Sequence, residues 1–326
     1  MRFSGRAANY NGCMTGIDQR PRAIFLMGPT ASGKTALAER LADRFDVELI
    51  SVDSALVYRG MDIGTAKPDA ATLARYPHRL IDIRDPQDTY SAADFRADAL
   101  REMHTIVRAG RVPLLVGGTG LYFRALQDGL SDLPEADADV RARLLNEAQA
   151  YGWPALHARL SELDPLAAAR IRSGDAQRIQ RALEVIALTG KPLSAQHGGQ
   201  SERFSYRVLK LALLPNDRGV LHERIAQRLD AMFARGLVDE VRVLRARAEL
   251  GSDLASMRAV GYRQVWQHLD GAHDLAECRQ RAIFATRQLA KRQITWLRSD
   301  RDALTIDPFD SLQQRRAEGA LADFLA

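Results

Sequence analysis

The fold is decided by residues 23–35, which read AIFLMGPTASGKT. The apolar run Ala23–Met27 has the length of a buried strand and ends in a Gly-Pro pair. A helical pattern follows, because apolar residues recur at every fourth position from Leu37 to Phe45. Between the strand and the helix, residues 28–35 match G-x-x-x-x-G-K-[ST] in full, in the context that a phosphate-binding P-loop requires.

The chemistry of this loop follows from its backbone. Glycines allow successive N–H groups to point into one concavity, and the start of the helix adds a partial positive charge. Lys34 would bring a full positive charge to the outer phosphate, and Thr35 would offer a hydroxyl ligand to Mg²⁺. The predicted diphosphate-binding residues of the loop are Gly28, Pro29, Thr30, Ala31, Ser32, Gly33, Lys34 and Thr35.

The motif indicates a polyphosphate ligand without specifying ATP. P-loop ATPases and GTPases commonly place a Walker-B aspartate to help hold the metal. Here the apolar run Pro113–Val116 ends in glycines, and Asp53 follows the run Val47–Val52 instead. An acid at that place is able to hold a metal or to take a proton, and the pattern alone does not choose.

Further apolar runs alternate with helical patterns, which predicts an α/β fold of P-loop type, with a parallel sheet, helices on both faces and an inserted all-helical domain. The other strand candidates are Val47–Val52, Leu80–Ile83, Pro113–Val116 and Val208–Leu214, and the helix candidates are Lys34–Phe45, Ala92–Ala109, Val220–Ala248 and Asp274–Arg298. The stretch Asp137–Gly190 is rich in Ala, Arg and Leu and has the character of helices only. The expected domains are a disordered tail at 1–20, a catalytic core at 21–130 and 201–326, and a helical insertion at 131–200.

Composition is that of a soluble globular protein, with 46% hydrophobic and 27% charged residues in a chain of 326. The 2 cysteines suggest neither a disulfide framework nor a zinc site. No apolar run reaches the roughly 18 residues of a membrane span. The net charge of +5 is mildly basic, so the distribution of charge must decide whether a partner is anionic. We expect a cytoplasmic monomer.

Several further motifs follow the phosphate loop in a fixed order along the chain. With residues 28–35 they are DSALVY at 53–58, GTAKP at 64–68, GGTGLY at 117–122, DAQRIQRALE at 175–184, VGYRQ at 260–264 and TRQLAKRQITWLR at 286–298. Together they resemble the tRNA dimethylallyltransferases, the bacterial enzymes that prenylate adenosine. The resemblance runs from about residue 21 to residue 298, and the set is specific in this order.

The resemblance implies a reaction and its partners. A dimethylallyl group would pass from dimethylallyl diphosphate to N6 of the adenosine 3′ of the anticodon in a tRNA, and pyrophosphate would leave with the help of Mg²⁺. The P-loop, with Lys34, would then stabilise the charge that develops on the leaving diphosphate. The resemblance also implies that Arg228 helps to hold the diphosphate. From the residues alone, Arg224 and Arg228 share one face of a helix, and a solvated face is the favoured interpretation.

Asp53 is the candidate general base. The amino group of adenine is a poor nucleophile until it loses a proton, and an aspartate is ionised at neutral pH and able to accept one. A helix N-cap or a metal ligand is the alternative role. Ser54 fits a cap or a base contact better than a nucleophile, because no second base lies near it in sequence. Thr119 resembles the family residue beside the reacting adenosine, although a structural turn explains it as well.

A basic surface is predicted near the C-terminus. Residues 279–298 contain six Lys and Arg side chains and no acid, which favours a nucleic-acid face over an ordinary mixed-charge surface helix. Residues 258–263 mix basic and aromatic side chains in a way that suits splayed RNA bases. The predicted contacts with the tRNA anticodon stem-loop are Asp53, Ser54, Ala55, Leu56, Thr119, Arg141, Gln177, Arg178, Ile179, Gln180, Arg181, Arg258, Ala259, Val260, Gly261, Tyr262, Arg263, Lys291, Arg292 and Arg298.

Two other functions are compatible with the P-loop. One is a small-molecule kinase that uses ATP, and the other is a non-catalytic RNA-binding NTPase. The transferase interpretation differs from both because it predicts a channel through the core, with adenine entering from one side and the prenyl diphosphate from the other. In that interpretation the helical insertion clamps the anticodon stem.

Overall fold

The computed structural model describes residues 19–131, 133–196 and 204–326, so nearly all of the expected tail at 1–20 lies outside the described residues. The chain divides into two compact units. The core unit comprises the described residues within 1–90, 98–120 and 205–326. The helical unit comprises those within 91–97 and 121–204, and so includes more than the stretch 131–200 that was expected to form a helical insertion.

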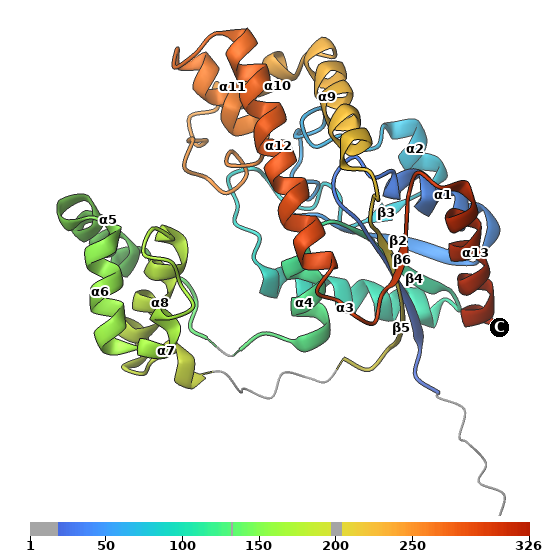
Figure 1. Cartoon of the computed structure of the whole chain (residues 1–326), viewed down its shortest axis with the longest axis horizontal. Coiled ribbons are helices and arrows are strands. Elements are labelled where there is room, and N and C mark those ends of the chain that lie inside the picture. Colours follow the sequence, from blue (N-terminus) through green and yellow to red (C-terminus); the bar gives the residue numbers. More distant parts are fainter. Residues whose placement is uncertain (1–18, 132, 197–203) are drawn as a thin grey trace, which may run out of the picture. The chain divides into compact units, whose positions relative to one another are not determined.

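The core unit is built on a parallel sheet in the order β3-β2-β4-β1-β5-β6, which confirms the predicted fold class (Figure 1). The strands are β1 (Arg22–Met27), β2 (Val47–Val52), β3 (His78–Arg79), β4 (Val112–Gly117), β5 (Arg207–Leu213) and β6 (Leu304–Ile306). Met27 of β1 and Val52 of β2 both pair with Gly117 of β4. The three strands therefore end at the same level, which brings the loops that follow them together.

The helices of the core and its border are α1 (Lys34–Arg44), α2 (Ala70–Arg75), α3 (Ala92–Arg108), α9 (Arg218–Ala234), α10 (Leu237–Arg245), α11 (Tyr262–Leu269), α12 (Leu275–Leu297) and α13 (Ser311–Leu325). Helices α1 and α13 bury Leu41, Leu321 and Phe324 against the strands in one apolar cluster. The chain moves from β1 past β4 to β2, then back to β4, so right-handed crossovers place α1 and α3 on opposite faces.

Three sequence-based expectations differ from the structure. The helix expected over Val220–Ala248 is two helices, because Gly236 has φ of 97° and starts α10. The strand expected at Leu80–Ile83 is displaced to β3, since Leu80 has a positive φ of 65° that no strand tolerates. Strand β6 and helix α13 had no sequence signal that we recognised; β6 has only 3 residues, too few for a period to show.

The helical unit contains α5 (Ala138–Tyr151), α6 (Trp153–Leu163), α7 (Pro165–Ala168), α8 (Ala176–Thr189), the 3₁₀ turn η1 (Leu193–Gln196) and nearly all of α4 (Gly120–Asp128). Its small apolar core includes Leu144, Leu160 and Ile179. Aspartates cap its helices: Asp137 accepts from the N–H of Val140 at the start of α5. No helix within the described ranges has both the length and the apolar character needed to cross a bilayer.

We predict that Gly117→Ala destabilises the core unit. A Cβ at Gly117 would lie 2.0 Å from the backbone oxygen of Val52, so the two strands would have to separate. The expected loss in the free energy of unfolding is about 3 kcal/mol or more, measured by urea denaturation. Gly319→Ala is the control, because nothing lies within 4 Å of that position in α13 and a helical alanine should stabilise slightly. Equal midpoints for the two variants would contradict this account.

Candidate active site

The phosphate loop leaves the end of β1 and is held in shape by backbone contacts. The N–H of Gly28 donates to the oxygen of Gly117 at 3.2 Å. Ala31 and Gly33 have left-handed conformations, with φ of 62° and 85°. Arg224 of α9 donates from Nε to the oxygen of Ala31 at 3.0 Å and so holds the unusual turn. Gly33 caps α1 without a side-chain bond, which leaves the amides of the first turn to a ligand.

Gln293 of α12 joins the phosphate loop to the end of β4. Its Oε1 accepts from the N–H of Thr30 at 2.9 Å, and its Nε2 donates to the oxygen of Gly118 at 3.1 Å. A Cβ at Gly118 would meet that amide at 2.4 Å, and one at Gly120 would meet the ring of Trp296 at 2.4 Å. The glycines of 117–120 thus allow α12 to approach the loop. From the sequence, residues 286–298 were interpreted through their basic side chains, and no role was predicted for Gln293.

Two cavities of the core unit meet at Lys34 and Arg228. The outer cavity, of about 450 Å³, is lined by Ala31, Gly33, Lys34, Thr35, Ala36, Arg224, Gln227 and Arg228. The inner cavity, of about 120 Å³, is lined by Thr30, Lys34, Asp53, Ala55, Gly64, Thr65, Arg228, Leu229, Met232, Ala259, Val260, Thr286 and Gln293. The outer cavity is dominated by basic side chains and first-turn backbone, whereas the inner cavity mixes apolar side chains with one carboxylate.

The two shared cations are poorly solvated. Burial lowers the pKa of Lys34 to about 8; the charge of Asp53 opposes this shift and that of Arg228 adds to it. Burial likewise lowers the pKa of Arg228, again with Asp53 acting in the opposite direction. Lys34 donates from Nζ to the oxygen of Pro29 at 3.2 Å, and Arg228 donates to the oxygen of Thr65 at 3.2 Å. Both side chains therefore donate to neutral carbonyl oxygens, and an anion would accept a stronger hydrogen bond from either cation.

Asp53 follows β2 and faces the inner cavity. Its Oδ1 accepts from the N–H of Ala55 at 2.9 Å and from that of Leu56 at 3.4 Å. Residues 54–57 form a turn and not a helix, so the helix N-cap that the sequence left open is not formed; the two bonds close this turn and use one of the two carboxylate oxygens. Because the same side chain lines the cavity beside Lys34, holding the turn does not compete with a second role there.

Thr119 lies between the loops that follow β2 and β4. Its N–H donates to the oxygen of Val52 at 3.3 Å, and its Oγ1 accepts from the N–H of Ser54 at 3.3 Å. Ser54 itself is exposed. Thr119 thus has the structural role in a turn that the sequence left open. Its hydroxyl lies next to the residues that follow Asp53.

An unexpected carboxylate orders the loop that lines the inner cavity. Glu240 of α10 accepts from three successive backbone N–H groups, those of Asp62 at 3.0 Å, Ile63 at 2.7 Å and Gly64 at 3.1 Å. It also accepts from the hydroxyl of Tyr262. Burial and the charge of Glu240 raise the pKa of Tyr262 above its usual range, so the phenol stays a donor. No short motif in the sequence links residues so far apart.

The loop 258–263 differs from the RNA-stacking surface that its composition suggested. Tyr262 has no exposed surface, and a Cβ at Gly64 would lie 2.4 Å from its ring, so the ring packs inside the core. Ala259 and Val260 line the inner cavity, and Gly261 is buried. In this loop only the side chains of Arg258 and Arg263 are exposed. The expected role of Tyr262 in stacking on RNA is therefore wrong, because the ring fills space inside the protein.

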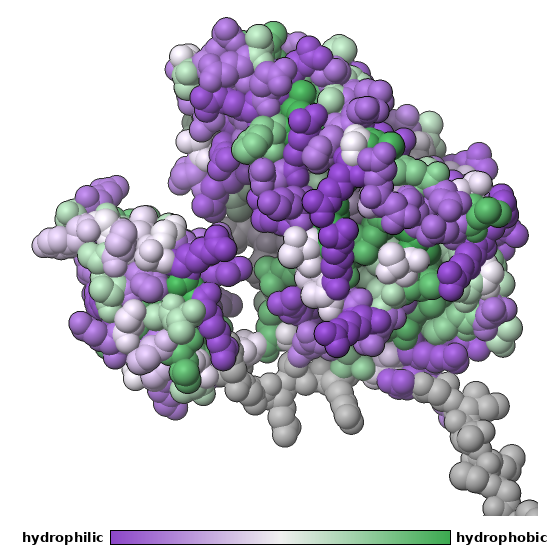
Figure 2. All heavy atoms as spheres, in the orientation of Figure 1, coloured by the Kyte–Doolittle hydropathy of each residue, from purple (hydrophilic) through white to green (hydrophobic). Residues whose placement is uncertain are grey.

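The basic stretch of α12 is smaller than its sequence suggested. Arg281 pairs with Glu277 at 2.6 Å, one turn earlier, and Arg279 pairs with Asp230 of α9. Acids outside the window 279–298 thus neutralise two of its cations. Lys291, Arg292 and Arg298 are exposed and make no ion pair with the described part of the chain, and Figure 2 shows a largely hydrophilic surface over these helices.

In the helical unit, the predicted RNA contacts separate into exposed and structural residues. Gln177 and Arg178 are exposed at the start of α8, whereas Ile179 has no exposed surface. Arg141 and Arg181 both bond the buried carboxylate of Glu184, at 2.7 and 2.8 Å. Gln180 donates to the oxygen of Arg141 at 3.3 Å.

Burial alone would raise the pKa of Glu184, but the hydrogen bonds from Arg141 and Arg181 outweigh it and lower the pKa. Removing either arginine would leave a buried charge short of a partner. These two cations therefore have a structural role, and their expected contact with RNA stays a prediction; Ile179 belongs to the apolar core of the unit.

We predict that Glu240→Gln destabilises the protein and weakens its affinity for pyrophosphate. An amide presents one oxygen to three N–H groups that now share a carboxylate, so bonds of the charge-assisted kind are lost. The expected cost is about 2 kcal/mol in urea denaturation, with a severalfold loss of pyrophosphate affinity in titration calorimetry. Asp239→Asn is the matched control, since the neighbouring side chain is exposed and pairs only with Arg242 among the described residues. Similar losses in both variants would contradict the role of Glu240.

Comparison with known proteins places these features in a family. The sequence model described as IPPT, IPP transferase, matches residues 56–300. The chain is 61% identical over 298 residues to the tRNA dimethylallyltransferase of Thiobacillus denitrificans, covering 91% of this chain and 95% of that protein. It is 58% identical over 317 residues to the protein of the same name from Stenotrophomonas maltophilia, covering 95% and 99%.

Solved structures agree with this assignment. The tRNA isopentenylpyrophosphate transferase of Bacillus halodurans superposes with a TM-score of 0.68 at 38% identity, covering 94% of this chain and 96% of that chain. A eukaryotic dimethylallyltransferase described as acting on tRNA superposes with a TM-score of 0.76 at 25% identity, covering 94% and 79%. Since the family match spans most of the chain and the relatives align along nearly their full length, the chain belongs to the IPP transferase family.

Proposed function

We propose that the chain transfers a dimethylallyl group from dimethylallyl diphosphate to N6 of the adenosine 3′ of the anticodon in tRNA. The observation that carries the proposal is the meeting of two unlike cavities at Lys34 and Arg228. One cavity suits a diphosphate, and the other suits a short apolar group next to a carboxylate. The relatives named as tRNA dimethylallyltransferases support the same reaction. We expect the enzyme to act in the cytoplasm as a monomer.

The diphosphate would occupy the outer cavity. The uncapped first turn of α1 offers backbone N–H groups, and Lys34 and Arg228 offer two cations that now rest on carbonyl oxygens. As the bond between C1 and the bridging oxygen breaks, its electron pair goes to the pyrophosphate, and these donors would stabilise the charge that develops. The dimethylallyl carbons would then lie toward Val260 and Met232 in the inner cavity.

Asp53 would act as the general base. The new bond joins N6 of the adenine to C1, and the proton from N6 would pass to the carboxylate of Asp53, which lines the inner cavity beside Lys34. Contacts of Oδ1 with two backbone N–H groups fix the orientation of the carboxylate before the substrate arrives. Thr119, on the neighbouring loop, would help to place the adenosine.

Mg²⁺ fits the donors of this site. Mg²⁺ usually takes one or two protein ligands together with waters and substrate phosphates. Thr35 lines the outer cavity and is exposed, and the described residues contain no cluster of three His, Cys, Asp or Glu side chains that would hold a metal by themselves. Thr35 would therefore hold Mg²⁺ through its hydroxyl only together with the diphosphate. When bound, the ion would neutralise part of the charge of the leaving group.

The two rival functions are not favoured. An ATP-dependent kinase and a non-catalytic RNA-binding NTPase both remain compatible with a P-loop in isolation. The relatives that align over the full core are instead named as transferases that act on tRNA. An NTPase, whose phosphoryl acceptor is water, would have no use for the apolar side chains of the inner cavity beyond Lys34.

The first test of the function is direct transfer. Protein, bulk tRNA, Mg²⁺ and labelled dimethylallyl diphosphate are mixed without any nucleoside triphosphate, and label retained in tRNA is counted. We expect Asp53→Asn to lower the single-turnover rate by about 10²- to 10⁴-fold while tRNA affinity stays within about twofold, because asparagine keeps an oxygen for the two N–H bonds but is not a base. A near-normal rate in this variant would remove Asp53 from the mechanism.

The second prediction concerns pH. A protonated Lys34 favours the anion, so pyrophosphate binding should be strongest below about pH 8, where the lysine is charged in the free protein. Above that pH binding must be accompanied by proton uptake, and the affinity should fall by about tenfold per pH unit. Lys34→Arg is the matched control, because arginine stays charged and only the ionisation of pyrophosphate itself remains. If both proteins give the same calorimetric profile, the titrating group is not Lys34.

A further inference from the structure

One aromatic side chain stands on the basic face of α12. Phe284 is 64% exposed, and helical spacing places it on the same side as Arg287 and Lys291. A single exposed apolar side chain is common on protein surfaces and by itself indicates nothing. The surroundings of Phe284 distinguish it from the other exposed apolar residues.

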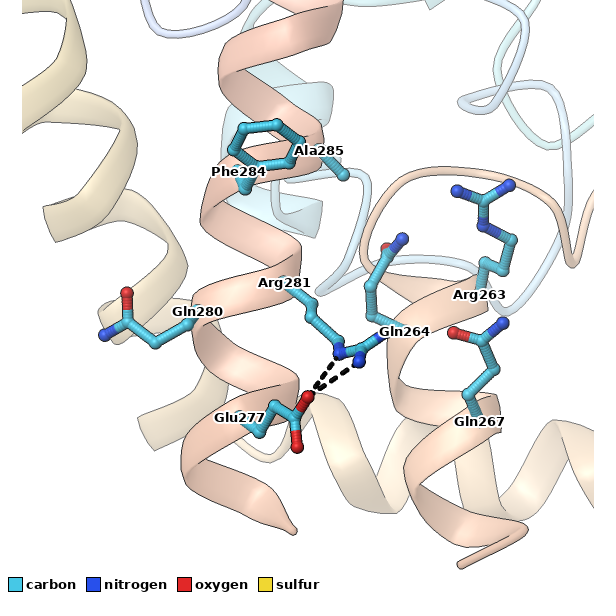
Figure 3. Close-up of a pocket in the computed structure, with 8 residues that line it drawn as sticks. All are labelled: Arg263, Gln264, Gln267, Glu277, Gln280, Arg281, Phe284 and Ala285. Carbon is cyan, nitrogen blue, oxygen red and sulfur yellow. Dashed lines mark hydrogen bonds and ion pairs between the residues drawn. The ribbon is translucent and has the colours of Figure 1, made fainter. Parts of the chain in front are cut away.

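Phe284 lies between two hollows of the core unit. The first, of about 670 Å³, lies between α11 and α12, and Figure 3 shows Phe284 at one end of it while Arg281 extends from α12 toward Gln264 of α11. The second, of about 350 Å³, lies between α9 and α12. Phe284 lines both hollows, so there is open space on two sides of one ring.

The second hollow combines an apolar floor with a basic rim. Leu221 and Ile294 form part of the floor, and Arg218, Arg287 and Lys291 stand around it. Within the described ranges these three cations have no acidic partner. The Nε atom of Arg287 is buried and makes no hydrogen bond to any described residue. The hollow therefore has positive charge that no described acid neutralises, next to an exposed ring.

We propose that Phe284 is a stacking platform for one unpaired base of the tRNA, whose neighbouring phosphates lie against Arg287 and Lys291. The inference rests on the proposed function, which supplies RNA as the substrate. An aromatic ring stacks on any base that is outside a duplex, and basic side chains beside it bind the backbone. A base inside a duplex is already stacked on both faces and offers no free face to the ring. The anticodon loop is the part of the substrate with unpaired bases.

Charge decides between RNA and the other occupants of such a hollow. A second copy of this chain would have to bring a surface that neutralises Arg218, Arg287 and Lys291, whereas every nucleotide of RNA carries a phosphate. The hollow also has room for a planar apolar group against the ring of Phe284. A nucleotide supplies both a planar base for this ring and a phosphate for the basic side chains.

The test compares three substitutions at one exposed position, where folding should not suffer. Affinity for a fluorescent anticodon stem-loop is measured by anisotropy. Phe284→Ala should weaken binding by about fivefold to about a hundredfold, Phe284→Leu should weaken it nearly as much, and Phe284→Trp should retain it. Leu275→Ala is the control on the same helix, since Leu275 is 50% exposed and lies outside both hollows. Leucine that binds as well as phenylalanine would overturn stacking.

A salt series separates stacking from charge. Phe284→Ala should leave the slope of log Kd against log salt unchanged, whereas Lys291→Ala should reduce it by about one. Single 2-aminopurine replacements along the RNA loop should give one position whose fluorescence change on binding is lost in Phe284→Ala. If no position loses its fluorescence change in Phe284→Ala, the inference is wrong.

The experiments distinguish failure of this inference from failure of the proposed function. A wild-type protein that binds and prenylates tRNA, together with a Phe284→Ala variant of equal affinity, overturns the stacking site and leaves the transferase intact. A wild-type protein that neither binds nor prenylates tRNA refutes the function itself. Sedimentation of both proteins completes the test: a dimer that Phe284→Ala dissolves, with RNA affinity unchanged, assigns the hollow to self-association and overturns the proposal.

Discussion

Two cations share a poorly solvated space beside a single carboxylate, and the other features of the site serve this arrangement. Burial lowers the pKa of both Lys34 and Arg228, and the charge of Asp53 opposes the shift only in part. Desolvated positive charge is costly unless an anion neutralises it. The folded chain therefore holds an electrostatic imbalance in advance, and under the proposed function a bound diphosphate would correct it.

Maintaining that imbalance requires a rigid frame, because flexible cations would simply turn out to solvent. The frame comes from three directions. Arg224 of α9 holds the left-handed turn at Ala31, Gln293 of α12 holds Thr30, and Glu240 of α10 holds the loop at 62–64. Each contact joins a side chain from the C-terminal half to backbone from the N-terminal half. The phosphate loop that follows β1 is thus shaped by helices that lie much later in the sequence.

Helix α12 serves the site on two of its faces. One face carries Gln293 and Trp296 against the glycines of 117–120, and the other carries Phe284 and Lys291 toward solvent. A substrate that pressed on the outer face would act on the element that orders the phosphate loop. Under the proposed function, this helix would offer a physical route between RNA on its outer face and the phosphate loop.

The parts that sequence reasoning predicted are those that local pattern controls. The strand, loop and helix around residues 22–44 follow from apolar spacing and two glycines, and the parallel order of strands places Asp53 beside the loop. Which side chains are exposed to solvent could not be predicted in the same way. Tyr262 and Ile179 looked like surface residues of basic motifs but fill cores, and Arg141, although exposed, also bonds a buried carboxylate 43 residues away.

The sequence by itself determined the chemistry of the site: a P-loop, a carboxylate at the next strand end and a basic C-terminal helix. Hydrophobic periodicity and turn residues act over a few positions, so they can be recognised from the sequence alone. Only the tertiary structure decided which cations are free. Whether an arginine meets an acid on another element depends on how distant segments pack, as Arg279 of α12 with Asp230 of α9 demonstrates, whereas Lys291 of the same helix has no ion pair among the described residues. Long-range packing also created the inner cavity, whose walls come from segments more than 200 residues apart and which no single motif contains.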